Sequence, residues 1–437
     1  MTLVLLRALA ARGLAVQPFK IGPDFIDTAY HSDVTGRSSI NLDLWMMGAE
    51  NLERSFTRFA ATADVSVVEG MGALYDGENG TERGSAAAIA KQLGLPVVLV
   101  VDVWGMTRST AAVLEGYLGF DRDVRFAGFV MNRVGSATHA RMILDSLPPQ
   151  LRELSLGYVL HRDALTIPER HLGLVTVEEN EGDREKRNVL LDAAATGLQL
   201  DRLVPGAASS RAPAPPPTAQ APERVRIAIA RDAAFCFYYA ENLELLEAAG
   251  AELVPFSPVA GQTLPEGAAG VYFGGGYPES FAAQLAANHA LADQLRDGAA
   301  AGMPIYGECG GFMYLGRSLT GFDDVAQPMA GLFGFDTLMD REHLAIRYVA
   351  VTTASESPLG PAGTEARGQE FHQSRITAAD GGDPLFQVAA DGGRQPVGLA
   401  RGGAAGSYVH LHFASNPDIA RHFVDSCRKW QGRRNSS

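Results

Sequence analysis

Short apolar runs alternate with helix-forming stretches along most of this chain. In the first half, apolar runs lie within residues 64–70, 96–103 and 125–134, and polar or glycine residues such as Glu69, Asp102 and Asn132 stand near their ends. Helical patterns at 84–94 and 108–119 lie between them. Near-continuous apolar strands separated by helices are typical of a parallel sheet that is covered on both faces. The first half is therefore predicted to be an α/β unit.

The second half repeats this pattern. Strand-like runs occupy 224–232, 251–258, 270–279, 303–311 and 406–414. In sheets of this kind, ligands bind beyond the carboxyl ends of the strands. The residues that directly follow each run are therefore the candidates for chemistry.

The clearest division between the two halves is a segment rich in Pro, Ala and Ser at 204–224. It has little to bury, and its consecutive prolines favour extended polyproline II, so it should be a semi-rigid linker. We expect a domain at 1–203, a linker at 204–223 and a domain at 224–437. The predicted fold class is α/β, with two doubly wound parallel-sheet domains joined by the Pro/Ala-rich linker.

Composition narrows the function classes. Of the 437 residues, 46% are hydrophobic and 20% are charged, and the net charge is −13, which argues against broad electrostatic binding to nucleic acid. No apolar stretch is long enough for a membrane span, and residues 1–16 are predicted to form an amphipathic helix rather than a signal peptide. With three cysteines a disulfide framework is not expected, so the sequence predicts a cytoplasmic protein.

Cys309 follows a strand-like run and precedes two glycines. Strand, sharp turn and helix form the arrangement that exposes a nucleophile, and the helix N-terminus should favour the reactive thiolate. The alternative is a small residue chosen for packing beside glycines. The sequence alone leaves both open.

Two further segments add candidates. Gly274, Gly275 and Gly276 follow a strand and could present backbone N–H groups to a developing oxyanion, or form an ordinary turn. His410 and His412 alternate along a late strand, so both should face one side, and one could be a general base. A structural histidine is the alternative.

In the first half, carboxylates follow two strands. Segment 18–31 supplies Lys20, Asp24, Asp27 and His31, and Glu69 ends a strand seven residues before Asp76. Carboxylates at strand ends suit Mg²⁺, which takes oxygen ligands and bridges phosphates. Loop acids that form turns or cap helices are the alternative for Asp27 and Asp76.

The second half resembles the class I glutamine amidotransferases, in their cobyrinic-acid-type subfamily, through YGECGGFMYLG (306–316), GGGYPE (274–279) and SYVHLHFASNP (407–417). The resemblance implies a flavodoxin-like sheet and attack of Cys309 on the side-chain amide of glutamine, which gives a glutamyl thioester and ammonia. The glycines at 274–276 would hold the oxyanion, and His410 is favoured over His412 as the base. Many members have Glu two residues after this histidine, whereas this chain has His412, so a Cys–His dyad is expected.

The first half resembles the dethiobiotin-synthetase-like, P-loop ATPase domain of the cobyrinic-acid-amidating family. The motifs are FKIGPDFID (19–27), NLDLWMMG (41–48), VVEGMGALYDG (67–77), VMNRVGS (130–136) and IPERHLGL (167–174). The resemblance implies that ATP phosphorylates the a and c acetate carboxylates of a corrin, cobyrinate, and that ammonia then forms the amides of the cobalamin pathway. The residue roles that it implies are Asp24 and Glu69 as Mg²⁺ ligands, Lys20 near phosphate or carboxylate charge, Asp76 near the acyl phosphate, and Asn132 and Arg133 at the nucleotide base or the substrate. Arg170 and His171 are expected to bind substrate, with a structural ion pair as the alternative.

The sequence departs from this family at its beginning. The family opens with a strand and a phosphate loop ending in Gly-Lys-Thr-Thr, and no segment here has the pattern G-x-x-x-x-G-K-[ST]. We expect a central strand to be missing from the sheet, which would expose apolar surface. A misplaced translation start is one explanation. An ATPase-deficient homologue, acting as a glutaminase or binding protein, is the alternative.

The resemblance also sets the expected partners. These are small molecules: a corrin polycarboxylate, glutamine and ATP with Mg²⁺, with no nucleic acid and no membrane. Hydrogenobyrinate and Ni-sirohydrochlorin remain alternative substrates, and a homodimer remains open. The segment 367–375 (RGQEFHQSR) resembles a family signature, expected to pack between the halves or to shape the glutamine site.

Overall fold

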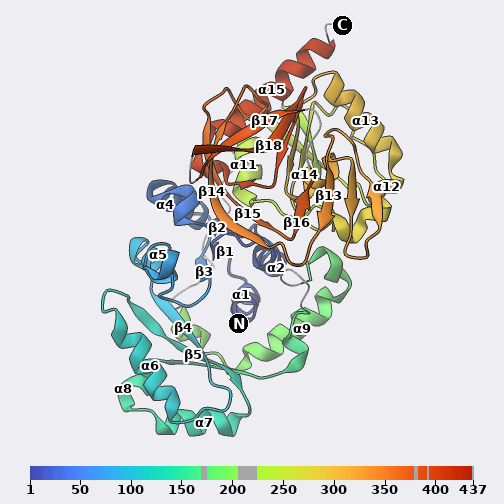
Figure 1. The fold of residues 1–437 in the computed structure, drawn as a ribbon. Coiled ribbons are helices and arrows are strands. Elements are labelled where there is room, and N and C mark those ends of the chain that lie inside the picture. Colours follow the sequence, from blue (N-terminus) through green and yellow to red (C-terminus); the bar gives the residue numbers. More distant parts are fainter. Residues whose placement is uncertain (169–174, 205–223, 378–381, 391–392, 436–437) are drawn as a thin grey trace. The chain divides into compact units, whose positions relative to one another are not determined.

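The computed structural model describes residues 1–168, 175–204, 224–377, 382–390 and 393–435 (Figure 1). The chain forms two compact units, one built from Met1–Leu44 and Leu52–Pro216 and the other from Trp45–Asn51 and Pro217–Ser437. Nearly all of the predicted linker, residues 205–223, lies outside the described residues. The division at 203 and 224 stays a prediction.

A short piece of the N-terminal half packs within the second unit. Trp45 stacks on Tyr348 with ring centroids 4.9 Å apart, and its carbonyl oxygen accepts a hydrogen bond from Arg367 at 2.9 Å. Asn51 donates to the carbonyl oxygen of Ala414 at 2.8 Å. Segment Trp45–Asn51 therefore belongs to the second compact unit.

The first unit contains two parallel three-stranded sheets. One has the order β2-β1-β3 and the other β4-β5-β6. The strands are β1 (Val16–Ile21), β2 (Ile40–Leu42), β3 (Val65–Glu69), β4 (Val97–Asp102), β5 (Phe126–Val134) and β6 (Ser155–Leu160). The helices before residue 204 are α1 (Thr2–Ala10), α2 (Ile26–Thr35), α3 (Leu44–Met47), α4 (Ala49–Ala60), α5 (Ala86–Gln92), α6 (Ser109–Phe120), α7 (Ala137–Ser146), α8 (Pro149–Glu153), α9 (Arg184–Ala194) and α10 (Leu200–Leu203). Most of α3 and the first turn of α4 fall in segment Trp45–Asn51 of the second unit.

Strands β3 and β4 lie at the edges of these two sheets and are not hydrogen-bonded to each other. Every residue of β1 is buried, whereas all of β3 is only half-buried and Val100 of β4 is 45% exposed. Apolar residues of both edge strands are therefore left partly open to solvent.

The predicted N-terminal helix is present as α1, which buries Val4, Leu6, Ala8 and Leu9. Their spacing gives the helix an apolar stripe that packs into the core of the first unit. Among the described helices, none has the length and apolar character required to cross a bilayer.

The second unit is built on one ten-stranded sheet of order β20-β15-β14-β17-β18-β19-β10-β9-β7-β8. Strands β8, β7, β9, β10 and β19 run parallel, in the order expected for a flavodoxin-like core. Their bounds are β7 (Val225–Ala230), β8 (Ala251–Phe256), β9 (Gly270–Phe273), β10 (Ile305–Glu308) and β19 (Ala404–Ser407). The predicted parallel core is therefore present.

The other half of this sheet is antiparallel, which corrects the expectation of a purely parallel sheet. Its strands are β14 (Ala345–Thr353), β15 (Glu365–His372), β17 (Asp383–Ala390), β18 (Gly393–Arg401) and β20 (His410–Leu411), drawn in orange and red in Figure 1. In β15, exposed and buried residues largely alternate, because one face of the strand stays open to solvent. Such alternation was not recognised in the sequence.

A four-stranded sheet, β12-β11-β13-β16, and five helices complete the second unit as described. The strands are β11 (Ser318–Thr320), β12 (Ala326–Pro328), β13 (Asp336–Met339) and β16 (Ser374–Ile376). The helices are α11 (Ala240–Ala248), α12 (Ala282–Ala287), α13 (His289–Ala300), α14 (Gly310–Leu315) and α15 (Asp418–Asn435).

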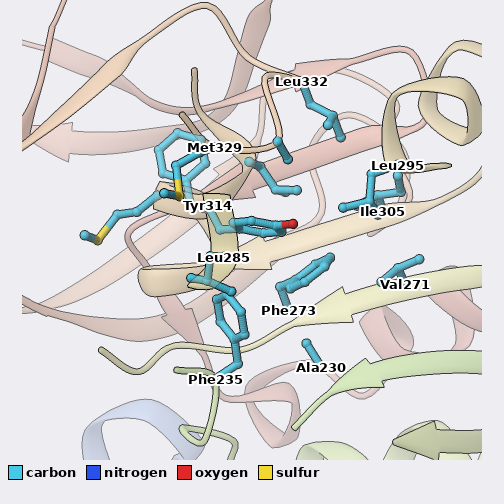
Figure 2. Packing of buried hydrophobic residues seen from close by; sticks show 14 of the residues in the cluster. Ala230, Phe235, Val271, Phe273, Leu285, Leu295, Ile305, Tyr314, Met329 and Leu332 are labelled. Carbon is cyan, nitrogen blue, oxygen red and sulfur yellow. The ribbon is translucent and has the colours of Figure 1, made fainter. Parts of the chain in front are cut away.

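One apolar cluster supports the turn that carries Cys309. Phe273 of β9 packs edge-on against Phe235, with ring centroids 5.4 Å apart, and at a tilt against Tyr314 of α14, with centroids 5.3 Å apart. Figure 2 shows these three rings within the cluster. Ile305 of β10 and Cys309 itself belong to the same buried cluster. The strand before the cysteine and the helix after it are thus fixed by one core.

Candidate functional site

Cys309 stands between strand β10 and helix α14 with φ 46° and ψ −104°. A positive φ is unusual for a residue with a side chain and stores roughly 1–3 kcal/mol of strain. Its neighbours are crowded, since a Cβ on Gly311 would lie 2.5 Å from the carbonyl oxygen of Phe273 and one on Gly310 would lie 2.9 Å from Pro278. The glycines are therefore required by close packing, and the geometry is that of a strained nucleophile turn.

The thiol of Cys309 is neutral in this environment. Burial raises its pKa most, and the carboxylates of Glu279, Glu308 and Glu370 raise it further, against the backbone N–H of Gly310, which lowers it. The sequence led us to expect a thiolate stabilised by the helix N-terminus, but the structure favours the neutral thiol. The effect of burial on the pKa is larger than the opposite effect of one short helix. A base must remove the thiol proton during reaction.

The glycine loop after β9 lies directly against this turn, but two of its N–H groups are already used. The N–H of Gly274 donates to the hydroxyl of Tyr238 at 2.8 Å, and that of Gly275 donates to the carbonyl of Phe237 at 3.2 Å. The predicted oxyanion role is corrected for Gly274 and Gly275, since both donors are occupied.

The N–H of Gly276 has no hydrogen-bond partner in the described part of the chain. A Cβ on Gly310 would lie 3.0 Å from this nitrogen, so Gly276 and Gly310 are immediate neighbours. Gly310 follows the nucleophile at the start of α14, the usual place of one oxyanion donor. Sequence reasoning missed Gly310, although its position directly after Cys309 was a usable signal.

His410 and His412 occupy different environments. The ring of His410 packs on Gly275, where an added Cβ would lie 2.2 Å from its Cε1 atom. The ring of His412 lies against Tyr239, with centroids 4.7 Å apart. Strand β19 ends at Ser407, the chain bends at Tyr408, and β20 covers only His410–Leu411, so the single long strand expected at 406–414 is interrupted.

Both histidines are buried and neutral. Burial lowers the pKa of His410 to about 3, with a further contribution from His372, and burial alone lowers the pKa of His412 to about 3. A neutral imidazole can accept a proton, as a general base must. Only His410 packs on the glycine loop beside the cysteine turn, which favours His410 as the base.

Glu308, which directly precedes the nucleophile, connects it to the histidine strand. The side chain is 1% exposed and accepts hydrogen bonds from the hydroxyls of Tyr272 at 2.8 Å and Tyr306 at 2.9 Å. It also accepts from the backbone N–H of Leu411 at 3.0 Å, between the two histidines. Burial raises the pKa of Glu308 to about 7 despite these bonds. Sequence analysis did not single out this residue.

A second side chain supports the same strand. Asn242 of α11 is fully buried, donates to the carbonyl of Leu411 at 2.7 Å and accepts from the N–H of Phe413 at 2.7 Å. Strand β20 pairs with β15 on one side. Glu308 and Asn242 thus satisfy, through side chains, the backbone groups on its other side.

Strand β15, which overlaps the predicted signature segment 367–375, also reaches the cysteine. The carbonyl oxygen of Phe371 lies 3.9 Å from the sulfur of Cys309. His372 stacks on Tyr408 with centroids 3.8 Å apart, and burial lowers its pKa to about 4. Of the two expectations for this segment, this geometry favours shaping of the amidotransferase site.

In the first unit, a cluster of charges gathers at the carboxyl ends of β1 and β3. Lys20 is 5% exposed and contacts Asp27 at 2.6 Å and Glu69 at 3.1 Å. His31 contacts Glu69 at 3.0 Å, and the hydroxyl of Thr2 donates to the same carboxylate. His31, Lys20 and Thr2 hold the pKa of Glu69 at about 2 although burial acts in the opposite direction. The predicted residues Lys20 and Glu69 are thus brought together.

Asp24 lies two residues before helix α2, and its carboxylate accepts from the N–H groups of Ile26 and Asp27 in the first turn, both at 2.8 Å. Burial raises its pKa. No group of three or more His, Cys, Asp or Glu side chains suited to a metal occurs among the described residues. Mg²⁺ needs only one or two carboxylates beside phosphates and water, so the oxygen donors of Asp24 and Glu69 fit it in kind.

The other residues predicted for the nucleotide site, Asp76, Asn132 and Arg133, have no contact with Lys20 or Glu69 among the described residues. Asp76 is exposed and makes no side-chain hydrogen bond or ion pair with another described residue. Arg133 has φ 56°, pairs with Asp102 at 2.8 Å and lies over the ring of Trp104 at 5.2 Å, while Asn132 is half-buried beside it in β5. The predicted substrate contacts Arg170 and His171 lie outside the described residues.

Comparison with known proteins gives the same two parts. Residues 226–418 match the CobB/CobQ-like glutamine amidotransferase domain, and residues 1–175 match the CobQ/CobB/MinD/ParA nucleotide binding domain. The chain is 42% identical to a cobyrinate a,c-diamide synthase of Syntrophotalea carbinolica, over 98% of this chain and 95% of that protein. It is 37% identical to another from Caldanaerobacter subterraneus, over 94% and 92% of the two chains. It is 38% identical to a hydrogenobyrinate a,c-diamide synthase of Streptomyces coelicolor, over 97% and 93%.

A cysteine on a strained turn, a glycine loop and a buried histidine, joined to a nucleotide-binding domain, define a glutamine-dependent amidating ligase. Identity of this extent over nearly the whole length then fixes the family. The chain belongs to the a,c-diamide synthase family of cobyrinate and hydrogenobyrinate amidating enzymes.

Proposed function

We propose that this enzyme uses glutamine and ATP to amidate the a and c acetate carboxylates of cobyrinate in cobalamin biosynthesis, in the cytoplasm. Two of the three relatives above bear the name cobyrinate a,c-diamide synthase, which supports this substrate. A relative named for hydrogenobyrinate supports the cobalt-free corrin as the second candidate. The two candidate substrates, cobyrinate and hydrogenobyrinate, differ from each other at the ring centre and not at the amidated edge.

In the proposed glutaminase step, His410 takes the proton of the Cys309 thiol as the sulfur attacks the amide carbon of glutamine. The N–H groups of Gly276 and Gly310 donate to the oxyanion. When the C–N bond breaks, His410 returns the proton to the leaving nitrogen, which departs as ammonia. Water then cleaves the thioester to glutamate and restores the thiol.

In the proposed synthetase step, a corrin carboxylate attacks the γ-phosphate of ATP and ADP leaves. Ammonia then attacks the acyl carbon and displaces phosphate, and loss of one proton leaves the amide. Lys20 offers positive charge for phosphate, and Asn132 and Arg133 contact the nucleotide. Asp76 acts near the acyl phosphate. Asp24 and Glu69 would hold Mg²⁺, which when bound neutralises phosphate charge.

The convergence of the Cys309 turn, Gly276 and His410 is the single observation that carries this proposal. Replacement Cys309→Ala should abolish release of ammonia from glutamine, by a factor on the order of 10³ or more, because the nucleophile is lost. Ammonia release from glutamine is the measurement, and Cys236→Ala is the matched control at a cysteine outside this turn.

Normal glutamine hydrolysis by the Cys309→Ala variant would contradict the proposal. For the whole reaction, product amides are measured with cobyrinate and with hydrogenobyrinate, each with glutamine or ammonium salt as nitrogen donor. Cys309→Ala should remove the use of glutamine and leave the use of ammonium intact, because only the donor site is changed.

A further inference from the structure

An ion pair lies beside the nucleophile and has no role in the steps above. Strands β14 and β15 are paired so that Arg347 stands opposite Glu370. Nε of Arg347 donates to Oε2 of Glu370 at 2.7 Å. The side chain of Glu370 is 5% exposed and that of Arg347 is 53% exposed, so the pair extends from the interior to solvent.

Glu370 is close to the sulfur that attacks the substrate. The carbonyl oxygen of the next residue, Phe371, lies 3.9 Å from the sulfur of Cys309, and the Glu370 carboxylate contributes to the raised pKa of that thiol. The Glu308 carboxylate also acts on the thiol, but it is enclosed by its bonds to Tyr272, Tyr306 and Leu411. Of Glu308 and Glu370, Glu370 is the one that pairs with a half-exposed arginine.

The pair retains hydrogen-bonding capacity on both members. Within the described residues, the side-chain contact of Arg347 uses its Nε, and that of Glu370 uses Oε2. The two terminal nitrogens of the guanidinium and Oε1 of the carboxylate remain for a ligand. A pair with one half-exposed partner contributes at most about 1 kcal/mol to stability, so stability alone gives little reason for it.

Glutamine brings the complementary charges to the same place. Three carbon–carbon bonds of about 1.5 Å each separate its amide carbon from its α-carbon, so a glutamine held at Cys309 has its ammonium and carboxylate within one side chain of the sulfur. We propose that Arg347 and Glu370 form the subsite for the α-amino acid group of the nitrogen donor. Glu370 accepts hydrogen bonds from the α-ammonium, and Arg347 donates to the α-carboxylate. This inference rests on the proposed glutaminase function and names the specificity determinants of that site.

Two truncated substrates separate the two contacts. Glutaramate lacks the α-ammonium, and 4-aminobutanamide lacks the α-carboxylate. In Glu370→Gln, kcat/KM for glutamine should fall about 10- to 100-fold, mainly through KM, while that for glutaramate stays the same, so discrimination between them is reduced. In Arg347→Gln, the ratio of kcat/KM for glutamine to that for 4-aminobutanamide should be reduced instead. Asp293→Asn, which breaks the exposed pair with Arg296 on α13, is the matched control and should leave both ratios unchanged.

A second measurement does not depend on turnover. Inactivation of Cys309 by a diazoketone analogue of glutamine, which carries the α-amino acid group, should slow in Glu370→Gln and Arg347→Gln. Inactivation by uncharged iodoacetamide should not slow. Unchanged substrate ratios and unchanged inactivation by the diazoketone in both variants would overturn the proposal. If the unmodified enzyme does not hydrolyse glutamine at all, the proposed function fails before this inference is reached.

Discussion

At the scale of single residues, the chemistry depends on a few buried polar groups whose neighbours set their protonation. Cys309 and His410 are both neutral at rest, since burial raises the pKa of the thiol and lowers that of the imidazole. A neutral pair costs little to bury, whereas a thiolate and an imidazolium would each have to be desolvated. The thiolate–imidazolium pair therefore belongs to the reaction rather than to the resting enzyme.

Glu308 is expected to position the base rather than to react. Replacement Glu308→Ala leaves the Leu411 N–H and two tyrosine hydroxyls without their acceptor, which shifts the strand that carries His410. We expect kcat for glutamine hydrolysis to fall about 100-fold with KM little changed, because a displaced base slows the chemical step. Steady-state kinetics of ammonia release are the measurement.

Glu308→Gln keeps one acceptor oxygen of nearly the same shape and should recover part of the lost rate. Glu252→Gln, at an exposed glutamate of β8, is the control and should behave as the unmodified enzyme. A folded Glu308→Ala enzyme with an unchanged kcat would show that the carboxylate does not position the base.

At the scale of elements, three segments from distant parts of the sequence converge: the end of β9, the turn between β10 and α14, and β20. Their backbones come so close that glycine is required where they meet. Gly275 and the ring of His410 are the closest of these approaches.

Gly275→Ala is therefore expected to inactivate the glutaminase. The added methyl group would lie 2.2 Å from Cε1 of His410 and must push the ring away. A displacement of about 1 Å in a catalytic group lowers rates about 100-fold. Ammonia release measures the loss, and circular dichroism establishes that the variant is folded.

The control for Gly275→Ala is Gly432→Ala in α15, where an added Cβ meets nothing within 4 Å. It should keep full activity and gain stability by up to about 1 kcal/mol, because alanine favours the helix. Equal activity of the two variants would contradict the placement of His410 on Gly275.

At the scale of the whole molecule, buried histidines make stability depend on pH. Burial lowers the pKa of His372 to about 4, and of His410 and His412 to about 3, from 6.5. The unfolded chain then binds more protons below pH 6.5, so stability is present above that pH and is lost as pH falls. Glu308 acts oppositely: its pKa of about 7 stabilises the fold below 4.5, and this contribution is lost as pH rises through 7.

Between pH 4.5 and 6.5, each of the three histidines lowers the free energy of unfolding by about 1.4 kcal/mol for each unit that the pH falls. Glu308 acts in the opposite direction by the same amount and so offsets one histidine. We expect the free energy of unfolding of the second unit to fall by about 3 kcal/mol per pH unit in this range. Urea unfolding at pH 7.5, 6.5 and 5.5 measures it. In His412→Phe the slope should decrease by about 1.4 kcal/mol per unit, and an unchanged slope would exclude His412 as a contributor.

The sequence by itself determined the α/β class, the parallel strands and the nucleophile turn. These are local properties: an apolar run between helices, or a cysteine followed by two glycines, has the same meaning wherever the chain leads. The motifs around Cys309, His410 and Glu69 also pointed to the family, because each is a contiguous stretch of residues. Lys20 and Glu69, 49 residues apart in sequence, were both predicted because each follows or ends a strand.

Only the tertiary structure decided which groups can act. Gly274 and Gly275 are excluded as oxyanion donors because Tyr238 and Phe237 accept from them, and neither contact is visible in the GGGYPE motif. Three further features join positions far apart in the chain. They are the hydrogen bond from Leu411 to Glu308, the ion pair of Arg347 with Glu370, and the membership of Trp45–Asn51 in the second unit. Hydrogen bonding and burial depend on these distant neighbours, so periodicity and motif spacing could identify the reactive residues but not their surroundings.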